Sequence, residues 1–285
     1  MSRLASLGHW FLLTRPWNVL AIGAMVAITQ HWLGFPLEEL YQVGAFGWIA
    51  VPMLIGAAGN LINDFFDLKE DRINKPHRVR VGRTVKRRVV IVTHWGLTLA
   101  ALIWSAWLSR ASGNILPLVL AASFSLVLYL YSPWLKGRGA LGNVTVATCV
   151  AGLCLWAWVS TVDLDEVVKE VDFKCFMLVI LIFLLTFMRE WVKDIQDVEG
   201  DVVAQHRTLA SRWSWARSKV VLWTGLGLFA GLSVWWTWER ALDHWQILAL
   251  AIGGAGSATA LLGMNTKALS AWLKVALGTV FLSLL

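Results

Sequence analysis

Long apolar runs, separated by short charged connections, dominate the sequence. Cutting the chain at its charged and turn-rich stretches leaves nine apolar segments, at residues 10–33, 41–62, 89–109, 114–132, 140–161, 173–190, 217–238, 244–263 and 269–285. Most have the length of about 17–25 residues with which an α-helix crosses a hydrocarbon layer of ~30 Å. These runs are too long for barrel strands, and helices satisfy their own backbone hydrogen bonds in lipid. We therefore predict an all-α fold, a polytopic bundle of about nine transmembrane helices.

The composition agrees with a membrane protein. Hydrophobic residues make up 58% of the 285-residue chain and charged residues 15%, whereas soluble domains contain about 45–50% apolar and about 25% charged residues. No linker or low-complexity stretch interrupts the pattern, so we expect residues 1–285 to form a single integral-membrane domain. The first apolar run is long and leads straight into others, so we expect no cleavable signal peptide. The three cysteines lie in or beside apolar segments, at spacings that indicate packing rather than zinc or disulfides.

The net charge of +7 is better explained by membrane topology than by nucleic-acid binding. Most Lys and Arg lie in alternate connections, at residues 60–88, 133–139 and 189–219, whereas the connections at 36–40 and 163–174 are net acidic. Lys and Arg concentrate on the cytoplasmic side of membrane proteins. We therefore expect a cytoplasmic N-terminus and an external C-terminus. A basic cytoplasmic face also suits anionic lipids and phosphorylated substrates.

Two acidic clusters begin within the apolar ends of segments, both on this basic side. In the first, Asp64, Asp67 and Asp71 have i, i+3 and i+7 spacing, so a continuing helix would carry them on one face. The second cluster forms a similar helical stripe, made of Glu190, Asp194, Asp197 and Asp201. Like charges at this spacing repel, so a compensating partner is expected. Mg²⁺ takes oxygen ligands and typically bridges one or two carboxylates to phosphate oxygens.

Polar and basic side chains accompany both clusters. The amides Asn60 and Asn63 precede the first aspartates, and the nearby cations are Lys75, Arg78, Arg80, Lys136, Arg138, Arg189, Lys193 and Arg207. Acids for a metal and cations for phosphate oxygens, on one membrane face, indicate a site for Mg²⁺ and a diphosphate. A solvated charged face would explain one such cluster, but not two with matching spacing.

With these clusters the chain resembles the UbiA superfamily of intramembrane prenyltransferases. The family motif NDxxDxxxD is present without departure at residues 63–71, and the second motif, DxxxD, is present at residues 197–201. The preceding Arg189, Glu190, Lys193 and Asp194 resemble the "RE..KD" of many members. Shorter similarities are "TRPWN" (14–18), "LYLYS" (128–132) and "GN" (142–143). They extend the resemblance over most of the chain.

The resemblance implies a helix bundle around a central cavity with a cytoplasmic cap, and a Mg²⁺-dependent transfer of a polyprenyl group from its diphosphate. The implied metal ligands are Asn63, Asp67, Asp71, Asp197 and Asp201. We add the neighbouring carboxylates of Asp64 and Asp194 as further candidate ligands. The implied diphosphate-binding residues are Asn60, Arg78, Lys136, Arg138, Arg189, Lys193 and Arg207. Among these, we expect direct catalytic roles for Asp67, Asp71, Asp197, Asp201 and Lys193. Metal ions and cationic side chains stabilise the charge that develops as the C1–O bond breaks.

One stretch departs from the family pattern. Relatives often have "AGKRTLA" after the second motif, whereas residues 204–210 read "AQHRTLA", so Gln205 and His206 replace Gly and Lys. We expect His206 to be a loop residue outside the core site. His94, in the third apolar segment, is expected to pack or to form an interhelical hydrogen bond.

The acceptor remains open between two classes. Residues 71–88 resemble a bacterial group usually classed with geranylgeranylglycerol-phosphate geranylgeranyltransferases, which favours a geranylgeranyl donor, a prenylglycerol phosphate acceptor and the bacterial inner membrane. In contrast, "RTLA" (207–210) resembles the naphthoate prenyltransferases, so an aromatic quinone precursor of the 4-hydroxybenzoate or dihydroxynaphthoate type is the alternative. Candidate acceptor contacts are Arg15, Asn18 and Tyr129, which are polar points in apolar segments. Interhelical hydrogen bonding would explain these three residues equally well.

Other functional classes fit less well. A transporter usually has internal repeats and charges at the membrane midplane, whereas these acids lie at segment ends. The sequence contains neither the DGxxAR stretch of CDP-alcohol phosphotransferases nor a GxxxxGK[ST] nucleotide loop. The expected partners are therefore a polyprenyl diphosphate donor, a lipid or aromatic acceptor and membrane lipids. We expect no nucleic acid and no obligate protein partner.

Overall fold

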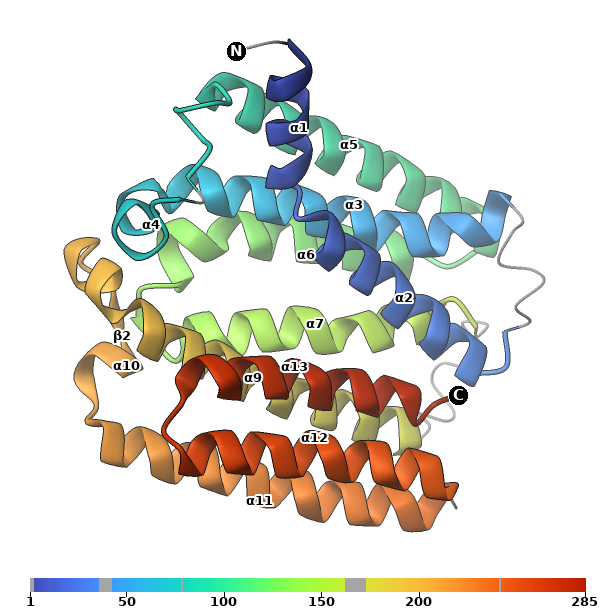
Figure 1. Ribbon diagram of the computed structural model, residues 1–285. Helices are drawn as coiled ribbons and strands as arrows, with labels where there is room; N and C mark the ends of the chain where they lie inside the picture. The colour runs from blue at the N-terminus through green and yellow to red at the C-terminus, as the bar shows by residue number, and fades with distance from the viewer. Residues whose placement is uncertain (1–2, 36–42, 78, 162–172, 241) are drawn as a thin grey trace. The chain divides into compact units, whose positions relative to one another are not determined.

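The computed structural model describes residues 3–35, 43–77, 79–161, 173–240 and 242–285. These residues are almost entirely helical (Figure 1), which confirms the predicted fold class. The helices are α1 (Arg3–Leu13), α2 (Pro16–Trp32), α3 (Val43–Phe66), α4 (Leu68–Asn74), α5 (Arg87–Ser112), α6 (Leu116–Leu130), α7 (Leu141–Val159), α9 (Phe173–Val203), α10 (Leu209–Arg212), α11 (Trp215–Arg240), α12 (His244–Leu262) and α13 (Thr266–Leu282). A π-helical turn, η2 (Tyr131–Leu135), follows α6, and two short strands are β1 (Arg138–Gly139) and β2 (Arg207–Thr208).

Each of the nine predicted apolar segments overlaps one long helix of the described chain, and several of these helices extend beyond the predicted segment. By length and composition, seven of these helices can cross a membrane. The other two, α2 and α13, have 17 residues each. At 1.5 Å per residue a helix of this length reaches about 25 Å, slightly less than the ~30 Å of a hydrocarbon core.

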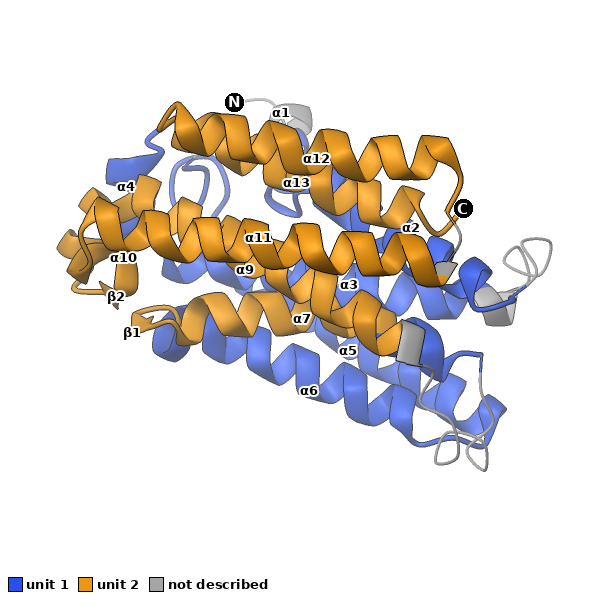
Figure 2. Cartoon of the chain, turned by 90° about the horizontal axis from the view of Figure 1, so that it is seen from below, with its two compact units in different colours: residues 1–135, 155–170 blue, residues 136–154, 171–285 orange. Residues whose placement is uncertain are grey.

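The chain divides into two compact units, coloured separately in Figure 2. Unit 1 comprises residues 1–135 and 155–170, and unit 2 comprises residues 136–154 and 171–285. The division falls within α7, so the first part of this helix belongs to unit 2 and its end to unit 1. The first aspartate motif lies in unit 1 and the second in unit 2.

In unit 1, α3 packs against α2, α5 and α6 (Figure 1). Gly59 of α3 lets α6 approach closely, because a Cβ atom there would lie 3.0 Å from Leu128 Cδ1. The buried His94 of α5 places Nδ1 3.0 Å from the carbonyl oxygen of Ala58 in α3. This contact confirms the interhelical hydrogen bond that we expected for His94.

In unit 2, α13 packs against both α9 and α12, and α11 also packs against these two helices. Small residues again permit close contact, since a Cβ atom on Gly253 of α12 would lie 2.7 Å from the Cα atom of Ala276 in α13. Trp236 of α11 is buried and donates a hydrogen bond to Ser283 Oγ over 3.1 Å. Cys154 and Cys175 are buried and Cys149 is half-buried, which agrees with the packing role that the sequence indicates.

Candidate active site

The first aspartate motif, residues 63–71, spans the end of α3 and the start of α4. Asp67 lies between the two helices, but its backbone N–H donates to Asn63 O and its own carbonyl accepts from Asp71 N, each over 2.9 Å. The helical hydrogen-bond pattern therefore continues through the motif, as the i, i+3, i+7 spacing predicted. Asp67 is only 4% exposed, and Asp64 and Asp71 are half-buried.

The turn between α1 and α2 is attached to this motif by two contacts. Arg15 forms an ion pair with Asp64, and Asn60 Nδ2 donates a hydrogen bond to Thr14 O over 2.9 Å. Arg15 has φ 54° and ψ 65°, a left-handed conformation that is unfavourable for a residue with a side chain. The roles of Arg15 and Asn60 toward substrates remain predictions, but the structure assigns both residues to the support of the motif helix.

Ser132 is a motif neighbour that the sequence analysis did not select. It lies in η2, is 5% exposed and donates a hydrogen bond from Oγ to Asn63 Oδ1 over 2.6 Å. This bond fixes the orientation of the Asn63 amide. The available signal was the position of Ser132 at the end of "LYLYS", one of the short family-like stretches. Its partner could not be read from the sequence.

Glu70 is a second residue that the sequence analysis missed. It is the fourth acid of the first cluster, but it lies off the stripe formed by the three aspartates. Its side chain is only 2% exposed on α4. A buried carboxylate is costly without positive charge or hydrogen-bond donors nearby. Glu70 therefore brings a buried carboxyl group to the first cluster.

The other predicted acceptor contacts have different surroundings. Tyr129 packs in an aromatic cluster with His94, Trp95 and Phe66, at ring-centroid distances of 5.8, 5.4 and 6.2 Å. These contacts of Tyr129 are therefore aromatic ring contacts with α3 and α5. Asn18 is exposed on α2. Contact of either residue with an acceptor is not tested by this arrangement and stays a prediction.

The second cluster lies entirely on α9, which continues to Val203, well beyond the predicted apolar segment. Glu190 is 4% exposed and accepts hydrogen bonds from Arg189 Nη1 and Lys193 Nζ, each over 2.6 Å. These two cations are predicted diphosphate-binding residues. Glu190 fixes their positions, and the pair offsets its buried charge.

Asp194 is held by a residue that we did not predict. Asn143 of α7 is 3% exposed and donates from Nδ2 to Asp194 Oδ2 over 2.9 Å. Both residues belong to unit 2. The sequence contained a weak signal, because Asn143 is part of the family-like "GN" pair.

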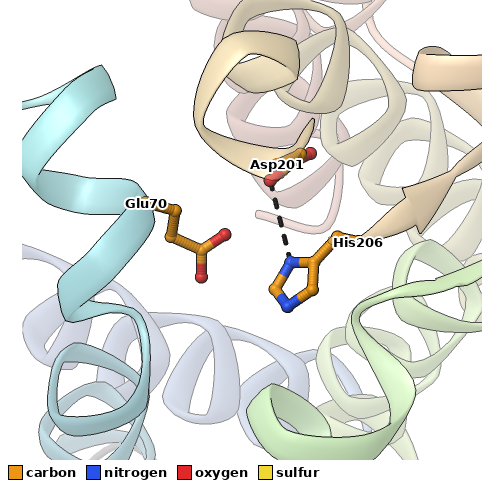
Figure 3. Close-up of side chains that lie close together, drawn as sticks. All are labelled: Glu70, Asp201 and His206. Carbon is orange, nitrogen blue, oxygen red and sulfur yellow. Dashed lines mark ion pairs between the residues drawn. The ribbon is translucent and has the colours of Figure 1, made fainter. Parts of the chain in front are cut away.

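His206 lies in the connection between α9 and β2, as expected, yet it is close to the second motif. Its Nδ1 is 3.9 Å from Oδ1 of Asp201, which is 2% exposed (Figure 3). The backbone N–H of His206 also donates to Asp201 O over 2.8 Å. Gln205 before it has φ 61°, in the region that glycine favours. This geometry explains the glycine of the family pattern at this position.

Two predicted diphosphate-binding arginines lie side by side in unit 2. The strands β1 and β2 pair in parallel, with Arg138 opposite Arg207 in the register. The backbone N–H of Arg207 donates to Gly137 O over 3.0 Å, and both arginine side chains are exposed. Lys136, just before β1, is half-buried. The remaining predicted cation of this set, Arg78, lies outside the described residues.

Each motif has a donor set that fits Mg²⁺. The first supplies the carboxylates Asp64, Asp67 and Asp71 with the Asn63 amide, and the second supplies Asp197 and Asp201. Oxygen donors of this kind are those that Mg²⁺ prefers. The burial of Asp67 and Asp201, at 4% and 2% exposure, calls for compensating positive charge in each unit.

Comparison with known proteins agrees with these features. The sequence profile of the UbiA prenyltransferase family matches residues 8–285. A digeranylgeranylglyceryl phosphate synthase of Sulfurisphaera tokodaii is 28% identical over 227 residues, which are 76% of this chain and 75% of the relative.

Solved structures have the same fold. One, from work on digeranylgeranylglyceryl phosphate synthase in membranes, has TM-score 0.70 and 24% identity and covers 98% of this chain and 97% of that chain. Another, a UbiA homologue from Archaeoglobus fulgidus bound to DMAPP and Mg²⁺, has TM-score 0.58 and 13% identity and covers 96% and 98% of the two chains. With the membrane helices and both aspartate motifs in place, the profile match shows that this chain belongs to the UbiA prenyltransferase family and is a multi-pass membrane prenyltransferase.

Proposed function

We propose that this enzyme transfers a geranylgeranyl group from geranylgeranyl diphosphate to the hydroxyl group of a prenylglycerol phosphate. The observation that carries the proposal is the shared name of several relatives, digeranylgeranylglyceryl phosphate synthase, at 26–32% identity. A product with two geranylgeranyl groups on glyceryl phosphate requires a geranylgeranyl donor and a geranylgeranylglyceryl phosphate acceptor. The first part of the basic connection at residues 71–88, before residue 79, contains Arg72 and Lys75, which suit an acceptor that carries its own phosphate.

In the proposed reaction the allylic C1–O bond of the donor breaks and the diphosphate leaves with the electron pair. The acceptor oxygen then bonds to C1 and loses its proton. Bound Mg²⁺ would supply the positive charge that neutralises the leaving diphosphate. Its proposed ligands are Asn63, Asp64, Asp67, Asp71, Asp194, Asp197 and Asp201.

The proposed diphosphate-binding cations act from fixed positions. Glu190 holds Arg189 and Lys193 by hydrogen bonds of 2.6 Å, and the parallel strands hold Arg138 beside Arg207. Cations that are already oriented need no reorganisation when charge develops on the leaving group, which is the main source of electrostatic catalysis. We infer the same function for Arg78, Lys136 and Asn60 from the family resemblance alone.

The proposed location is the bacterial inner membrane. The Lys and Arg residues of alternate connections support a cytoplasmic N-terminus, a cytoplasmic diphosphate site and an external C-terminus. A membrane enzyme suits this reaction because a long isoprenoid chain remains among apolar helices while its diphosphate reaches the aqueous side.

The decisive experiment offers one labelled donor to several acceptors. Purified enzyme in lipid nanodiscs receives labelled geranylgeranyl diphosphate and Mg²⁺ with geranylgeranylglyceryl phosphate, 4-hydroxybenzoate or dihydroxynaphthoate. We expect label to enter the glyceryl phosphate product. Exclusive labelling of an aromatic acceptor would overturn the proposed acceptor class. Ion flux across liposomes that contain the protein, without transfer, would instead indicate a transporter.

The aspartate motifs are tested by isosteric variants. Asp67→Asn and Asp197→Asn should each lower kcat by at least ~100-fold, the size of effect seen when one electrostatic stabiliser is removed. Their thermal unfolding should stay close to that of the wild type. Asp243→Asn, an exposed aspartate at the start of α12, is the matched control and should leave kcat unchanged. Full activity of either motif variant would exclude our assignment of the metal ligands.

A further inference from the structure

A basic turn precedes α5 in unit 1 and continues into the first two residues of this helix. We name residues 79–88 the basic turn. A bridge between Val81 and Val85 closes it, and the backbone N–H of Gly82 donates to Val85 O over 2.8 Å. Gly82 has φ 77°, a conformation that favours glycine. The turn is therefore an ordered structure with its own hydrogen bonds.

Three valines fasten this turn to the interior. Val79, Val81 and Val85 are 9%, 1% and 4% exposed, and the last two pack in a buried cluster with Leu13 and Leu61. The cations lie at the intervening and following positions, where Arg83, Lys86, Arg87 and Arg88 are all exposed. The buried valines therefore fix the backbone from which these exposed cations extend, whereas Arg80 is half-buried.

Acidic and basic side chains near the turn differ in their exposure to solvent. Among the described residues of 66–88, Asp67 and Glu70 are buried and Asp71 is half-buried. The exposed charged residues in the same range are all basic, namely Lys69, Arg72, Arg83, Lys86, Arg87 and Arg88. The exposed face is thus cationic without compensating carboxylates from its own segment.

Helix stability does not account for the position of these cations. Lys86 is the N-cap of α5, Arg87 and Arg88 follow it, and the first turn of this helix contains no acid. The positive end of the helix dipole lies at the same place and disfavours cations there. The arrangement becomes favourable when an anion is bound from outside.

The position of the turn relative to the membrane indicates which anion it binds. The candidate membrane span of α5 starts at Arg87, and Val89 and Val92, within the next two turns, are 43% and 68% exposed. Exposed apolar side chains on a membrane helix face lipid chains, so the cations just before them lie at the level of the lipid headgroups. We propose that the basic turn binds the phosphate groups of anionic membrane lipids.

The basic turn also contacts the first aspartate motif. The Arg87 guanidinium carbon lies 4.6 Å from the ring centroid of Phe65, and Phe65 lies between Asp64 and Asp67 in the sequence. Anionic lipid bound at the turn therefore stabilises a segment that packs on the motif. Because of this contact, Arg87 is left intact in the test below.

The test measures lipid selectivity directly. Full-length protein is reconstituted in phosphatidylcholine with a trace of spin-labelled phosphatidylglycerol or spin-labelled phosphatidylcholine, and the immobilised fraction is read by electron paramagnetic resonance. The wild type should prefer phosphatidylglycerol. The variant Arg83→Gln/Lys86→Gln/Arg88→Gln should lose at least about fivefold of this preference, because one cation near an anionic surface contributes about 1 kcal/mol.

Two matched single variants separate the turn from net charge. Arg88→Gln removes one exposed cation of the turn and should lower the preference, whereas Arg110→Gln removes one exposed cation at the opposite end of α5 and should keep it. Equal losses in both single variants, or no loss in the triple variant, would overturn the proposal. It would also be overturned if the triple variant kept its lipid preference but lost prenyl transfer in pure phosphatidylcholine, since the turn would then bind a substrate phosphate. Prenyl transfer is scored separately, so failure of the proposed acceptor leaves this test valid.

Discussion

Single residues around the motifs show how backbone conformation and family pattern are linked. Gln205 has φ 61° in the connection that follows the second motif, where relatives carry glycine according to the family pattern. A residue with a Cβ atom in this region costs about 1–2 kcal/mol. The neighbouring His206 nevertheless reaches Asp201, so the altered pair keeps a side chain beside the motif.

Restoring glycine should therefore stabilise the protein. We expect Gln205→Gly to raise the free energy of unfolding by about 1 kcal/mol, because strain is removed at a position that already has a left-handed conformation. Thermal unfolding in detergent measures the change. Gln205→Ala keeps the Cβ atom and should give no gain. If both variants stabilise equally, the side chain rather than the backbone is responsible.

Ser132 offers a second test at the residue scale, because it acts through Asn63. Ser132→Ala removes the 2.6 Å hydrogen bond to Asn63 Oδ1 and should cost about 1 kcal/mol of stability. If the bond orients a metal ligand, the Mg²⁺ concentration for half-maximal activity should also rise several-fold, and Ser132→Thr should restore it. Ser105→Ala, which loses only a local bond to Leu102 O, should leave the Mg²⁺ dependence unchanged. An unchanged Mg²⁺ dependence in Ser132→Ala would make Ser132 purely structural.

At the scale of elements, the apolar runs predicted the long helices well and their ends poorly. The predicted segment 173–190 ended where charges begin, whereas α9 continues to Val203. The i, i+4 spacing of its acids had already indicated a helix there. Partners on other elements, such as Asn143 for Asp194, could not be predicted, because a single sequence does not state which helix faces contact each other.

The turn between α1 and α2 gives an element-scale prediction. Arg15→Gln removes the ion pair with Asp64 and should lower the free energy of unfolding, measured without Mg²⁺, by about 1 kcal/mol. Asp64→Asn in the Arg15→Gln background should cost little more, since the interaction is already lost. Arg110→Gln, at the far end of α5, is the neutral control. Additive losses would show that the two residues contribute independently.

At the scale of the whole molecule, the number of membrane crossings depends on α2 and α13. Among the described residues, seven helices are long and apolar enough to cross a membrane, while these two have 17 residues each. A helix of about 25 Å can still cross if the bilayer thins locally, at a cost of fractions of a kcal/mol per Å of mismatch. The penalty is small compared with the burial of an apolar helix, so we expect both to cross.

The position of the N-terminus shows whether α2 crosses the membrane. If α2 crosses, the N-terminus lies on the same side as the basic connection at residues 66–88, which the positive-inside rule assigns to the cytoplasm. If α2 does not cross, the N-terminus lies on the opposite, external side. A fluorescent protein that folds only in the cytoplasm, fused before Met1, should therefore be fluorescent in cells. A second fusion after Asn74, in the basic connection, is the cytoplasmic control. A dark N-terminal fusion beside a bright control would show that α2 remains on one side of the membrane.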